Sequence, residues 1–190
     1  EDINGQTWTV QTIQPGGAKF FATGSKKESN FHVVDSEHRG LAALDAVTAI
    51  VIAEGYATAD TLSQALSCPV VAAFDSGNLL KVAQVLQKKY PQKPIVIAGD
   101  DDLTQESING KNPGKEKAME AAQLVNGAVV LPIFAPGEQM LQQLSDFNDL
   151  ANKSVLGIEA VKRQVGSVVE KVSQQAKQDS LLRLQTPIAS

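Results

Sequence analysis

Four short apolar runs in the middle of the sequence constrain the fold more than any other feature. Each run is a nearly continuous series of Val, Ile and Ala, and the stretches between the runs repeat apolar residues at helical spacing. Continuous apolar strands that alternate with helices are typical of a parallel sheet covered on both faces. We therefore expect an α/β fold whose parallel sheet has about four strands. The predicted strands are AIVIA (49–53), PVVAAF (69–74), PIVIAG (94–99) and GAVVLP (127–132), and the predicted helices span 58–66, 78–89 and 114–125.

The first part of the chain follows a different pattern. Residues 6–34 alternate and are rich in Thr, Val, Phe and Trp, with turn sequences at 15–17 and at Gly24. This pattern predicts a small antiparallel β region made of hairpins. We expect its aromatic residues, Trp8, Phe20 and Phe21, to form the core of that region, and the two histidines, His32 and His38, to be ordinary surface or hairpin residues.

The last part of the chain predicts one amphipathic helix. From about Asn152 onward, five apolar residues recur at alternating steps of three and four. Valine is a poor helix former, so the helix needs contact with the rest of the protein, at least as far as Val172. We expect a monomer, and a tail that frays from about Gln178. The stripe consists of Ile158, Val161, Val165, Val168 and Val172, and the predicted regions are 1–36 (β hairpins), 37–151 (catalytic domain) and 152–190 (helix and tail).

Composition excludes several classes of function. The formal net charge of −4 argues against a protein that binds nucleic acid by bulk positive charge, so any polyanion is held locally. Cys68 is the one cysteine, which excludes an internal disulfide and a cysteine-based zinc site and fits a cytoplasmic protein. No apolar stretch is long enough to span a membrane. The chain begins at Glu1 without a methionine, so we expect a fragment of a longer protein.

Acidic residues follow three of the four predicted strands. Glu54 and Gly55 follow the first, DSGN (75–78) follows the second and GDDD (99–102) includes the end of the third. Because the carboxyl ends of parallel strands meet at one edge of a sheet, these residues can share one pocket. Carboxylates that share a pocket repel one another unless protons or cations neutralise them.

A hard divalent cation accounts for such a cluster. Mg²⁺ prefers oxygen ligands and keeps several waters, which suits two or three carboxylates on loops. On an extended loop Asp100 and Asp102 point to one side and Asp101 to the other. We therefore expect Glu54, Asp100 and Asp102 to bind Mg²⁺ or Mn²⁺.

Simpler roles remain open for each residue taken alone. An aspartate that follows Gly99 is common in turns, and Glu54 before a glycine is compatible with a solvated loop. Asp75 or Ser76 is equally suited to cap the helix that follows.

These motifs, taken in order, resemble the Toprim domain of bacterial replicative primases, type IA and type II topoisomerases, and related nucleases and recombination proteins. The resemblance covers roughly residues 49–150. EGYATA (54–59) is similar to the first motif of replicative primases, and GDDD matches the Asp-x-Asp motif through Asp100 and Asp102. NPGKEKAMEAA (112–122) is similar to the helix that follows, although LTQESINGK intervenes here and predicts a longer loop near the metal site.

SDFNDL (145–150) resembles the third acidic motif of primases. There the family often has Lys before the first Asp and an acid two positions after it, whereas this chain has Ser145 and Asn148. The resemblance carries a metal-ligand role over to Asp146 and leaves open whether Asn148 or Asp149 completes the motif.

The segment that precedes the first predicted strand indicates which class of Toprim protein the chain resembles. Residues 10–34 are similar to the glycine-rich hairpin region ahead of Toprim in plasmid and phage primases, including those of conjugative plasmids. The resemblance implies RNA primer synthesis on single-stranded DNA from nucleoside triphosphates. It also implies partner domains in the parent protein, namely a zinc ribbon and in some proteins a helicase or relaxase.

The resemblance also implies roles for individual residues. Metals bound by Asp100, Asp102 and Asp146 would orient the triphosphate and stabilise developing charge, and Glu54 is the expected general base or a further ligand. Flanking glycines, an amide and lysines are expected to contact nucleotide or nucleic acid, because glycines leave room for phosphate and helix starts favour anions. These residues are Gly55, Gly77, Asn78, Lys81 and Lys115, with Lys111 and Lys117 as further candidates.

Two other classes of function remain open. The same carboxylates and metals can cleave a phosphodiester, so a Toprim nuclease is the nearest alternative enzyme. A non-catalytic Toprim-like module that binds nucleic acid inside a mobilisation protein is the other. A receiver-type or haloacid dehalogenase-type phosphotransferase is disfavoured, because such folds need an early strand-end Asp and a later strand-end Lys.

Overall fold

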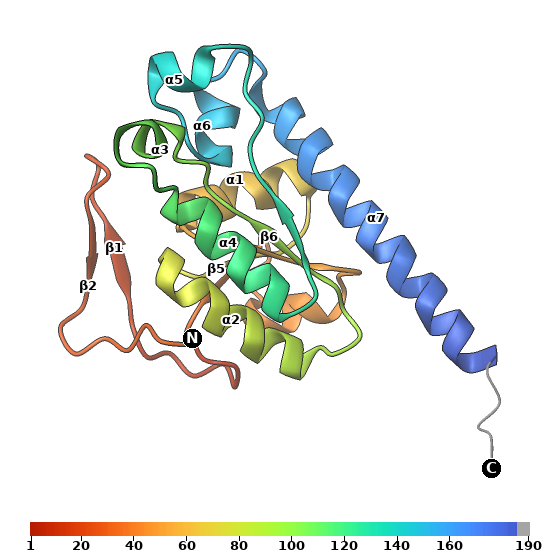
Figure 1. Cartoon of the computed structure of the whole chain (residues 1–190). Helices are drawn as coiled ribbons and strands as arrows, with labels where there is room; N and C mark the ends of the chain where they lie inside the picture. The colour runs from red at the N-terminus through yellow and green to blue at the C-terminus, as the bar shows by residue number, and fades with distance from the viewer. Residues whose placement is uncertain (186–190) are drawn as a thin grey trace.

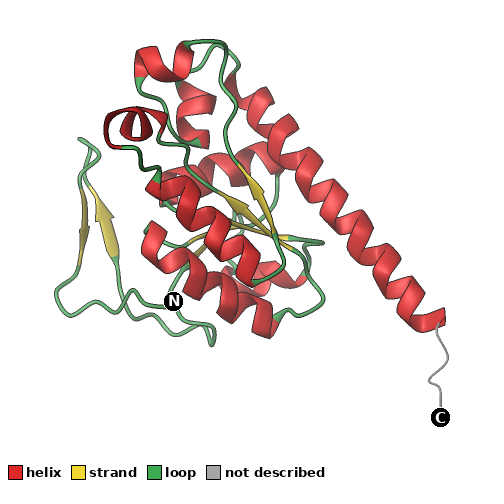
Figure 2. Ribbon diagram, viewed as in Figure 1, coloured by secondary structure: helices red, strands yellow, loops and turns green. Residues whose placement is uncertain are grey.

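The predicted strands form most of a five-stranded sheet in the computed structural model, which describes residues 1–185 (Figures 1 and 2). The order of the strands is β3-β5-β4-β6-β7. All residues of β4, β5 and β6 are buried, as continuous apolar runs require. The predicted α/β class is therefore confirmed. The strands span His32–Val34 (β3), Ile50–Ala53 (β4), Val70–Ala72 (β5), Ile95–Ala98 (β6) and Ala128–Val130 (β7).

The four later strands run parallel, and their register aligns the strand ends. Ile50 pairs with Ile95 and Ala53 pairs with Ala98, so β4 and β6 end level with each other. β5 pairs with the other side of β4. The loops after β4, β5 and β6 therefore leave the centre of the sheet at the same edge.

The fifth strand, β3, was not expected in this sheet. It lies antiparallel to β5 at the sheet edge, with Val33 opposite Val71, whereas the sequence predicted that these residues belong to the small amino-terminal β region. Val33 packs in the core on one face of the sheet and Val34 in the core on the other. Its pairing partner is far away along the chain, so a local pattern of alternation could not identify it.

Helices cover both faces of the sheet (Figure 1). α2, α4 and the 3₁₀ helix η1 pack against one face, and α1, α6 and α7 pack against the other. Gly99 allows the close approach of α4, because a Cβ there would stand 2.5 Å from the Cβ of Ala118. The bounds are Gly40–Asp45 (η1), Tyr56–Leu66 (α1), Ser76–Lys89 (α2), Leu103–Asn109 (α3), Pro113–Leu124 (α4), Glu138–Gln142 (α5), Phe147–Asn152 (α6) and Gly157–Gln185 (α7).

The hairpin of β1 (Gln11–Ile13) and β2 (Lys19–Phe21) stands beside the main domain (Figure 1). The prediction that its aromatic residues form a small core of their own is wrong. Trp8 is 39% exposed and Phe20 is 55% exposed, because the two-stranded ribbon has no second layer to cover them. Phe21 instead packs against Phe74 of the main domain, with the rings perpendicular and their centroids 5.5 Å apart.

The segment predicted as a longer loop after Asp102 contains a short helix, α3. None of its residues is buried. An apolar period, the signal that identified the other helices, is therefore missing from α3. The helix ends at Gly110, whose φ of 70° is in the left-handed region that glycine adopts without a steric cost.

The carboxyl-terminal helix α7 packs against its own domain, as the sequence predicted. Val161 and Val165 are fully buried, while Ile158 at the start of the predicted stripe is 40% exposed. The Ser173 hydroxyl donates a hydrogen bond of 3.1 Å to Thr48. The prediction that the tail frays from Gln178 is wrong for the described residues, since α7 continues to Gln185. None of the described helices is long and apolar enough to span a membrane.

Candidate functional site

Four carboxylates gather at the edge of the sheet where β4 and β6 end. Glu54 follows β4, Asp100 and Asp102 follow β6, and Asp146 caps the start of α6. Each of the other three carboxylates acts on Asp100 through its charge. The sheet register therefore brings together residues that are up to 92 positions apart in the sequence, from Glu54 to Asp146.

Asp100 lies at the centre of this cluster. Burial, followed by the charges of Glu54, Asp146 and Asp102, raises its pKa from 3.8 to about 8. Its Oδ1 is buried and accepts no hydrogen bond from any described residue. A buried carboxylate oxygen without a partner needs a cation or a hydrogen-bond donor nearby.

Glu54 is also in an environment that disfavours its charge. Burial is the largest cause of its raised pKa, and the carboxylates of Asp102 and Asp75 add to it. A backbone hydrogen bond from Ser76 opposes the rise. A glutamate whose pKa is raised toward neutrality can accept a proton from a substrate hydroxyl, so the environment suits a general base as well as a ligand.

Asp146 is fixed by hydrogen bonds from two helices. Its Oδ1 accepts from the backbone N–H of Asp149 at 2.7 Å, and its Oδ2 accepts from the Thr58 hydroxyl at 3.1 Å. Burial is the largest cause of its raised pKa. Asn148 is bonded to Thr61, and Asp149 forms an ion pair of 2.8 Å with Lys153. Of the three residues in this motif, Asp146 is the one whose charge acts on Asp100.

The loop that carries the aspartates is held by Asn112, which is buried at the start of α4. Its Nδ2 donates to Asp101 Oδ1 at 2.8 Å, and its Oδ1 accepts from the backbone N–H of Asp102 at 3.0 Å. Asp101 therefore serves the scaffold, while its two neighbours face the cluster. Gly114 completes the fit, because a Cβ there would stand 3.0 Å from the Cβ of Asp100.

The residues present fit a hard divalent cation. An unpaired buried oxygen of Asp100, together with carboxylates that repel it, is the chemistry that Mg²⁺ neutralises. Within residues 1–185, no three His, Cys, Asp or Glu side chains already stand close enough to hold a metal together. The carboxylate oxygens are therefore suitable ligands for Mg²⁺, and they lie farther apart than the ligands of a bound ion would.

The predicted nucleotide-binding residues lie in different settings. Gly55 precedes α1 at the cluster, and Gly77 is exposed in the first turn of α2. Lys81 forms an ion pair of 2.7 Å with Glu28. Lys115 is half-buried next to Gly114 in the first turn of α4. Of the further candidates, Lys111 is exposed and Lys117 forms an ion pair of 2.7 Å with Glu120.

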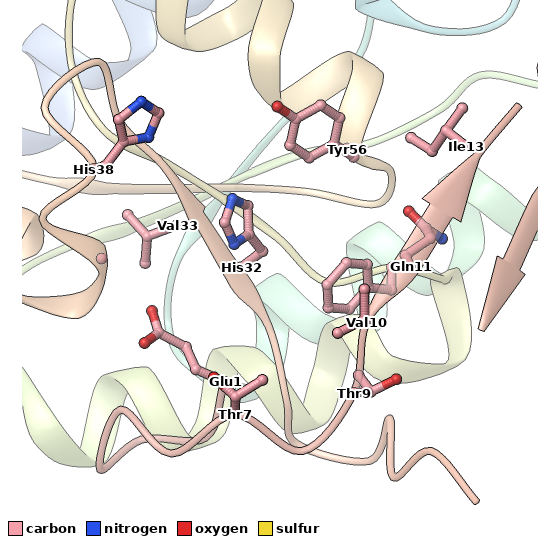
Figure 3. Close-up of a pocket in the computed structure, with 12 residues that line it drawn as sticks. Glu1, Thr7, Thr9, Val10, Gln11, Ile13, His32, Val33, His38 and Tyr56 are labelled. Carbon is pink, nitrogen blue, oxygen red and sulfur yellow. The ribbon is translucent and has the colours of Figure 1, made fainter. Parts of the chain in front are cut away.

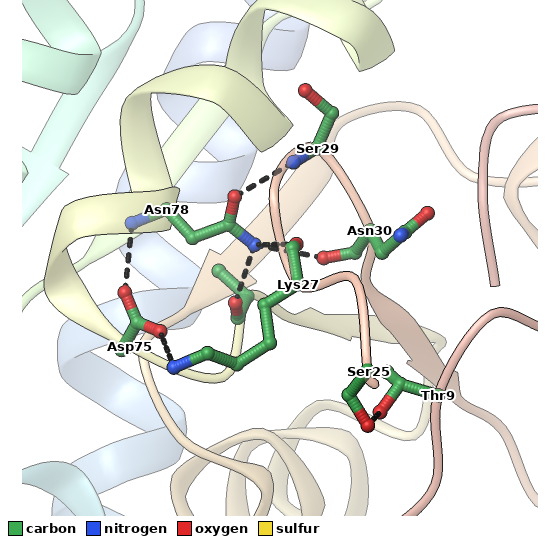
Figure 4. Close-up of polar contacts among 8 residues, drawn as sticks. Thr9, Ser25, Lys27, Ser29, Asn30, Asp75 and Asn78 are labelled. Carbon is green, nitrogen blue, oxygen red and sulfur yellow. Dashed lines mark hydrogen bonds and ion pairs between the residues drawn. The ribbon is translucent and has the colours of Figure 1, made fainter. Parts of the chain in front are cut away.

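Asn78 uses its side chain inside the protein (Figure 4). The Nδ2 group donates to the carbonyl oxygens of Lys27, Asn30 and Ala73 at 2.8–2.9 Å, and Oδ1 accepts from the backbone N–H of Ser29 at 2.8 Å. Its amide therefore fastens the segment between the hairpin and β3 to the start of α2. A contact between this amide and a nucleotide would compete with the four existing hydrogen bonds.

Lys19 is a residue of the site that the sequence analysis missed. It lies on β2, and its Nζ is 3.6 Å from the position that a Cβ would take on Gly55. Its positive charge opposes the rise in the pKa of both Glu54 and Asp100. The sequence contains one sign of a positively charged amino-terminal region. Residues 3–27 contain three lysines, Lys19, Lys26 and Lys27, and no acidic residue, although the chain as a whole is acidic.

Comparisons with known proteins agree with this geometry. The family model described as "Toprim domain" matches residues 49–155, which is more than half of the chain. Two proteins of Escherichia coli, both described as DNA primase TraC, are each 40% identical to the chain, over 93% and 90% of its length. The chain spans 16% and 21% of the lengths of these relatives. No solved structure matches.

Proposed function

Because this chain belongs to the Toprim family, we propose that it is the catalytic core of a plasmid-type or phage-type primase and joins ribonucleotides on a single-stranded DNA template. The observation that carries the proposal is the buried, unpaired oxygen of Asp100 among three other carboxylates at the strand ends. The similarity to two DNA primases supports the same reading. The chain matches about a fifth of each relative or less, so any zinc-ribbon, helicase or relaxase domains belong to the proposal for the parent protein.

The carboxylates would have different roles in nucleotidyl transfer. Asp100, Asp102 and Asp146 would hold Mg²⁺ or Mn²⁺, with Glu54 as an additional ligand or as the base that accepts the proton of the attacking hydroxyl. The bound cation would supply charge neutralisation at the triphosphate. Thr58 and Asn112 would keep the carboxylates in place through the hydrogen bonds described above.

Metal binding by the 190-residue chain tests the site directly. We expect Asp100→Asn and Asp102→Asn to weaken Mn²⁺ binding by about tenfold or more, since losing even an outer-shell partner of a metal ligand commonly costs that much. Asp60→Asn is the matched control, because Asp60 is half-exposed on α1 and, among the described residues, its carboxylate accepts a hydrogen bond from Gln64 alone. Titration calorimetry measures all three variants. Parental Mn²⁺ affinity in both cluster variants would remove these aspartates from the site.

A joining assay tests the reaction. Incorporation of labelled ribonucleotides on single-stranded DNA should be abolished by Glu54→Gln in the full-length protein, with the melting curve retained. The same preparations are tested for cleavage of single-stranded and duplex DNA. Cleavage without joining would identify a Toprim nuclease, and metal binding with neither activity would identify a non-catalytic module.

A further inference from the structure

A cavity of about 590 Å³ lies between the hairpin and the edge of the sheet (Figure 3). β1 forms one wall, and His32 of β3 with Tyr56 of α1 forms the opposite wall. The volume is in the range of about 300–1,000 Å³ that small-molecule sites occupy. No residue of the carboxylate cluster lines this cavity.

Several aromatic rings line this cavity. The rings of His32 and Tyr56 have centroids 5.8 Å apart and are tilted by 37°. Phe74 also lines the cavity, with a φ of 75°, a left-handed conformation that is strained for a bulky residue. Strain of this kind persists only where the surroundings enforce it, and here it turns a third ring toward the same space.

The wall formed by β1 and the residues before it is partly polar. Thr7, Thr9, Val10, Gln11 and Ile13 line the cavity there, and Gln11 contributes the side-chain amide. No described residue forms a hydrogen bond with the side-chain amide of Gln11, which is half-buried and therefore has a donor and an acceptor to offer. Burial lowers the pKa of His32, so its imidazole is neutral at neutral pH and can also donate and accept.

The cavity lies next to the carboxylate cluster, and this position indicates which kind of ligand it can hold. Tyr56 is two residues after Glu54, and Phe74 directly precedes Asp75, whose charge acts on Glu54. The cavity and the carboxylate cluster therefore adjoin at the same edge of the sheet. Lys19 lies on the same hairpin at the cluster, where phosphates are expected.

We infer that this cavity binds a nucleobase, stacked on the rings of His32, Tyr56 and Phe74 and hydrogen-bonded by the amide of Gln11. The inference rests on the proposed function, because phosphates at the cluster would place the attached base within reach of the cavity. The base can belong to the incoming nucleoside triphosphate or to the template strand. Aromatic rings suit any base, because each base has a π-face, and the neutral amide suits its hydrogen-bonding edge.

Binding of ligands with and without a base distinguishes a base of the incoming triphosphate from a base of the template strand. One arm compares a short oligothymidylate with an oligomer of the same length made of abasic deoxyribose phosphates. The other arm compares ATP with inorganic triphosphate. Fluorescence anisotropy, by direct binding and by competition in the presence of Mg²⁺, measures the affinity of the 190-residue chain for each ligand.

Two cavity variants and one control are sufficient. We expect His32→Ala and Gln11→Ala to weaken binding of the base-bearing ligand by about fivefold or more in at least one arm, and to leave the base-free ligand unaffected. Thr12→Ala is the control, because Thr12 is exposed on the opposite face of β1. Circular dichroism and melting curves of each variant verify the fold.

The two proposals fail separately. Parental affinity of both cavity variants, or equal affinity of the parent for base-bearing and base-free ligands in both arms, would overturn the nucleobase site. Neither result affects the metal-binding and joining tests. A loss in the ATP arm alone assigns the cavity to the substrate base, and a loss in the oligothymidylate arm alone assigns it to the template.

Discussion

At the scale of single residues, Asp100 shows how the fold gathers negative charge around one buried carboxylate. The alternation of side chains along GDDD predicted that Asp100 and Asp102 face one side, and Asp101 is indeed bonded to Asn112 on the scaffold. The contribution of Lys19 could not be predicted, because it depends on where the hairpin lies relative to the sheet. The sequence contains the charge of Lys19 but not the contact that brings it beside Gly55.

The stability of the metal-free protein should depend on pH through Asp100. Its pKa is about 8 in the folded protein and near 3.8 in an unfolded chain, so the folded state holds the extra proton between these values. The free energy of unfolding should therefore fall as pH rises from about 4 to about 8 and then stay level. Glu54 and Asp146, whose pKa values are also raised, contribute in the same direction.

Melting temperatures measured in a chelator across this pH range test the prediction. Asp100→Asn should flatten the decline, and Mg²⁺ should stabilise the parent most at high pH, where the carboxylates are ionised. A decline of equal slope in Asp100→Asn and the parent would contradict the assignment.

At the scale of elements, local patterns predicted most strands and helices but not their distant partners. The runs that became β4, β5 and β6 are continuous because both faces of each strand are covered, and that signal is local. β3 has the alternation of a hairpin strand, and only its pairing with β5 places it in the main sheet. The exposure of Trp8 and Phe20 has a similar cause, since nothing in their sequence shows that the hairpin lacks a second layer.

Two apolar positions on α7 should respond differently to truncation to alanine. Val161 is fully buried against the sheet and α1, so Val161→Ala should lower the free energy of unfolding by about 1.5–3 kcal/mol through lost burial and a cavity. Ile158 belongs to the same sequence stripe but is 40% exposed, so Ile158→Ala should cost clearly less. Chemical denaturation of both variants measures the difference. Equal losses would show that the stripe is buried along its whole length.

At the scale of the whole molecule, α7 combines a packed half with a half that extends away from the domain (Figure 1). Contacts with the sheet and α1 include Val172, and the hydroxyl of Ser173 reaches Thr48. Beyond this point the side chains described in α7 are exposed or half-exposed. The position of this boundary could not be predicted, because the apolar stripe shows where contact is needed and not where the domain ends.

Two truncations locate the boundary by experiment. A chain that ends after Gln174 should keep a melting temperature close to that of the parent, because it retains the buried residues of α7. A chain that ends after Leu156 loses the buried side chains of Val161 and Val165 and should melt several degrees lower or fail to fold. Sedimentation of the parent tests the expected monomer. A dimer that the shorter tail converts to monomers would show that the extended half binds a second copy.

The four hydrogen bonds of Asn78 have a consequence for how a polymer can enter the molecule. Three of them fix the hairpin to the domain through residues 27–30, and the hydrogen bond from Thr9 to Ser25 joins the two legs near the same end. At the opposite end, no described residue other than the immediate chain neighbours stands within 4 Å of the positions that a Cβ would take on Gly16 or Gly17 in the turn. The hairpin is thus attached to the domain at its base, and its turn is open on the side of Gly16 and Gly17. In the proposed function, a single-stranded template would therefore enter past this turn without needing a free end.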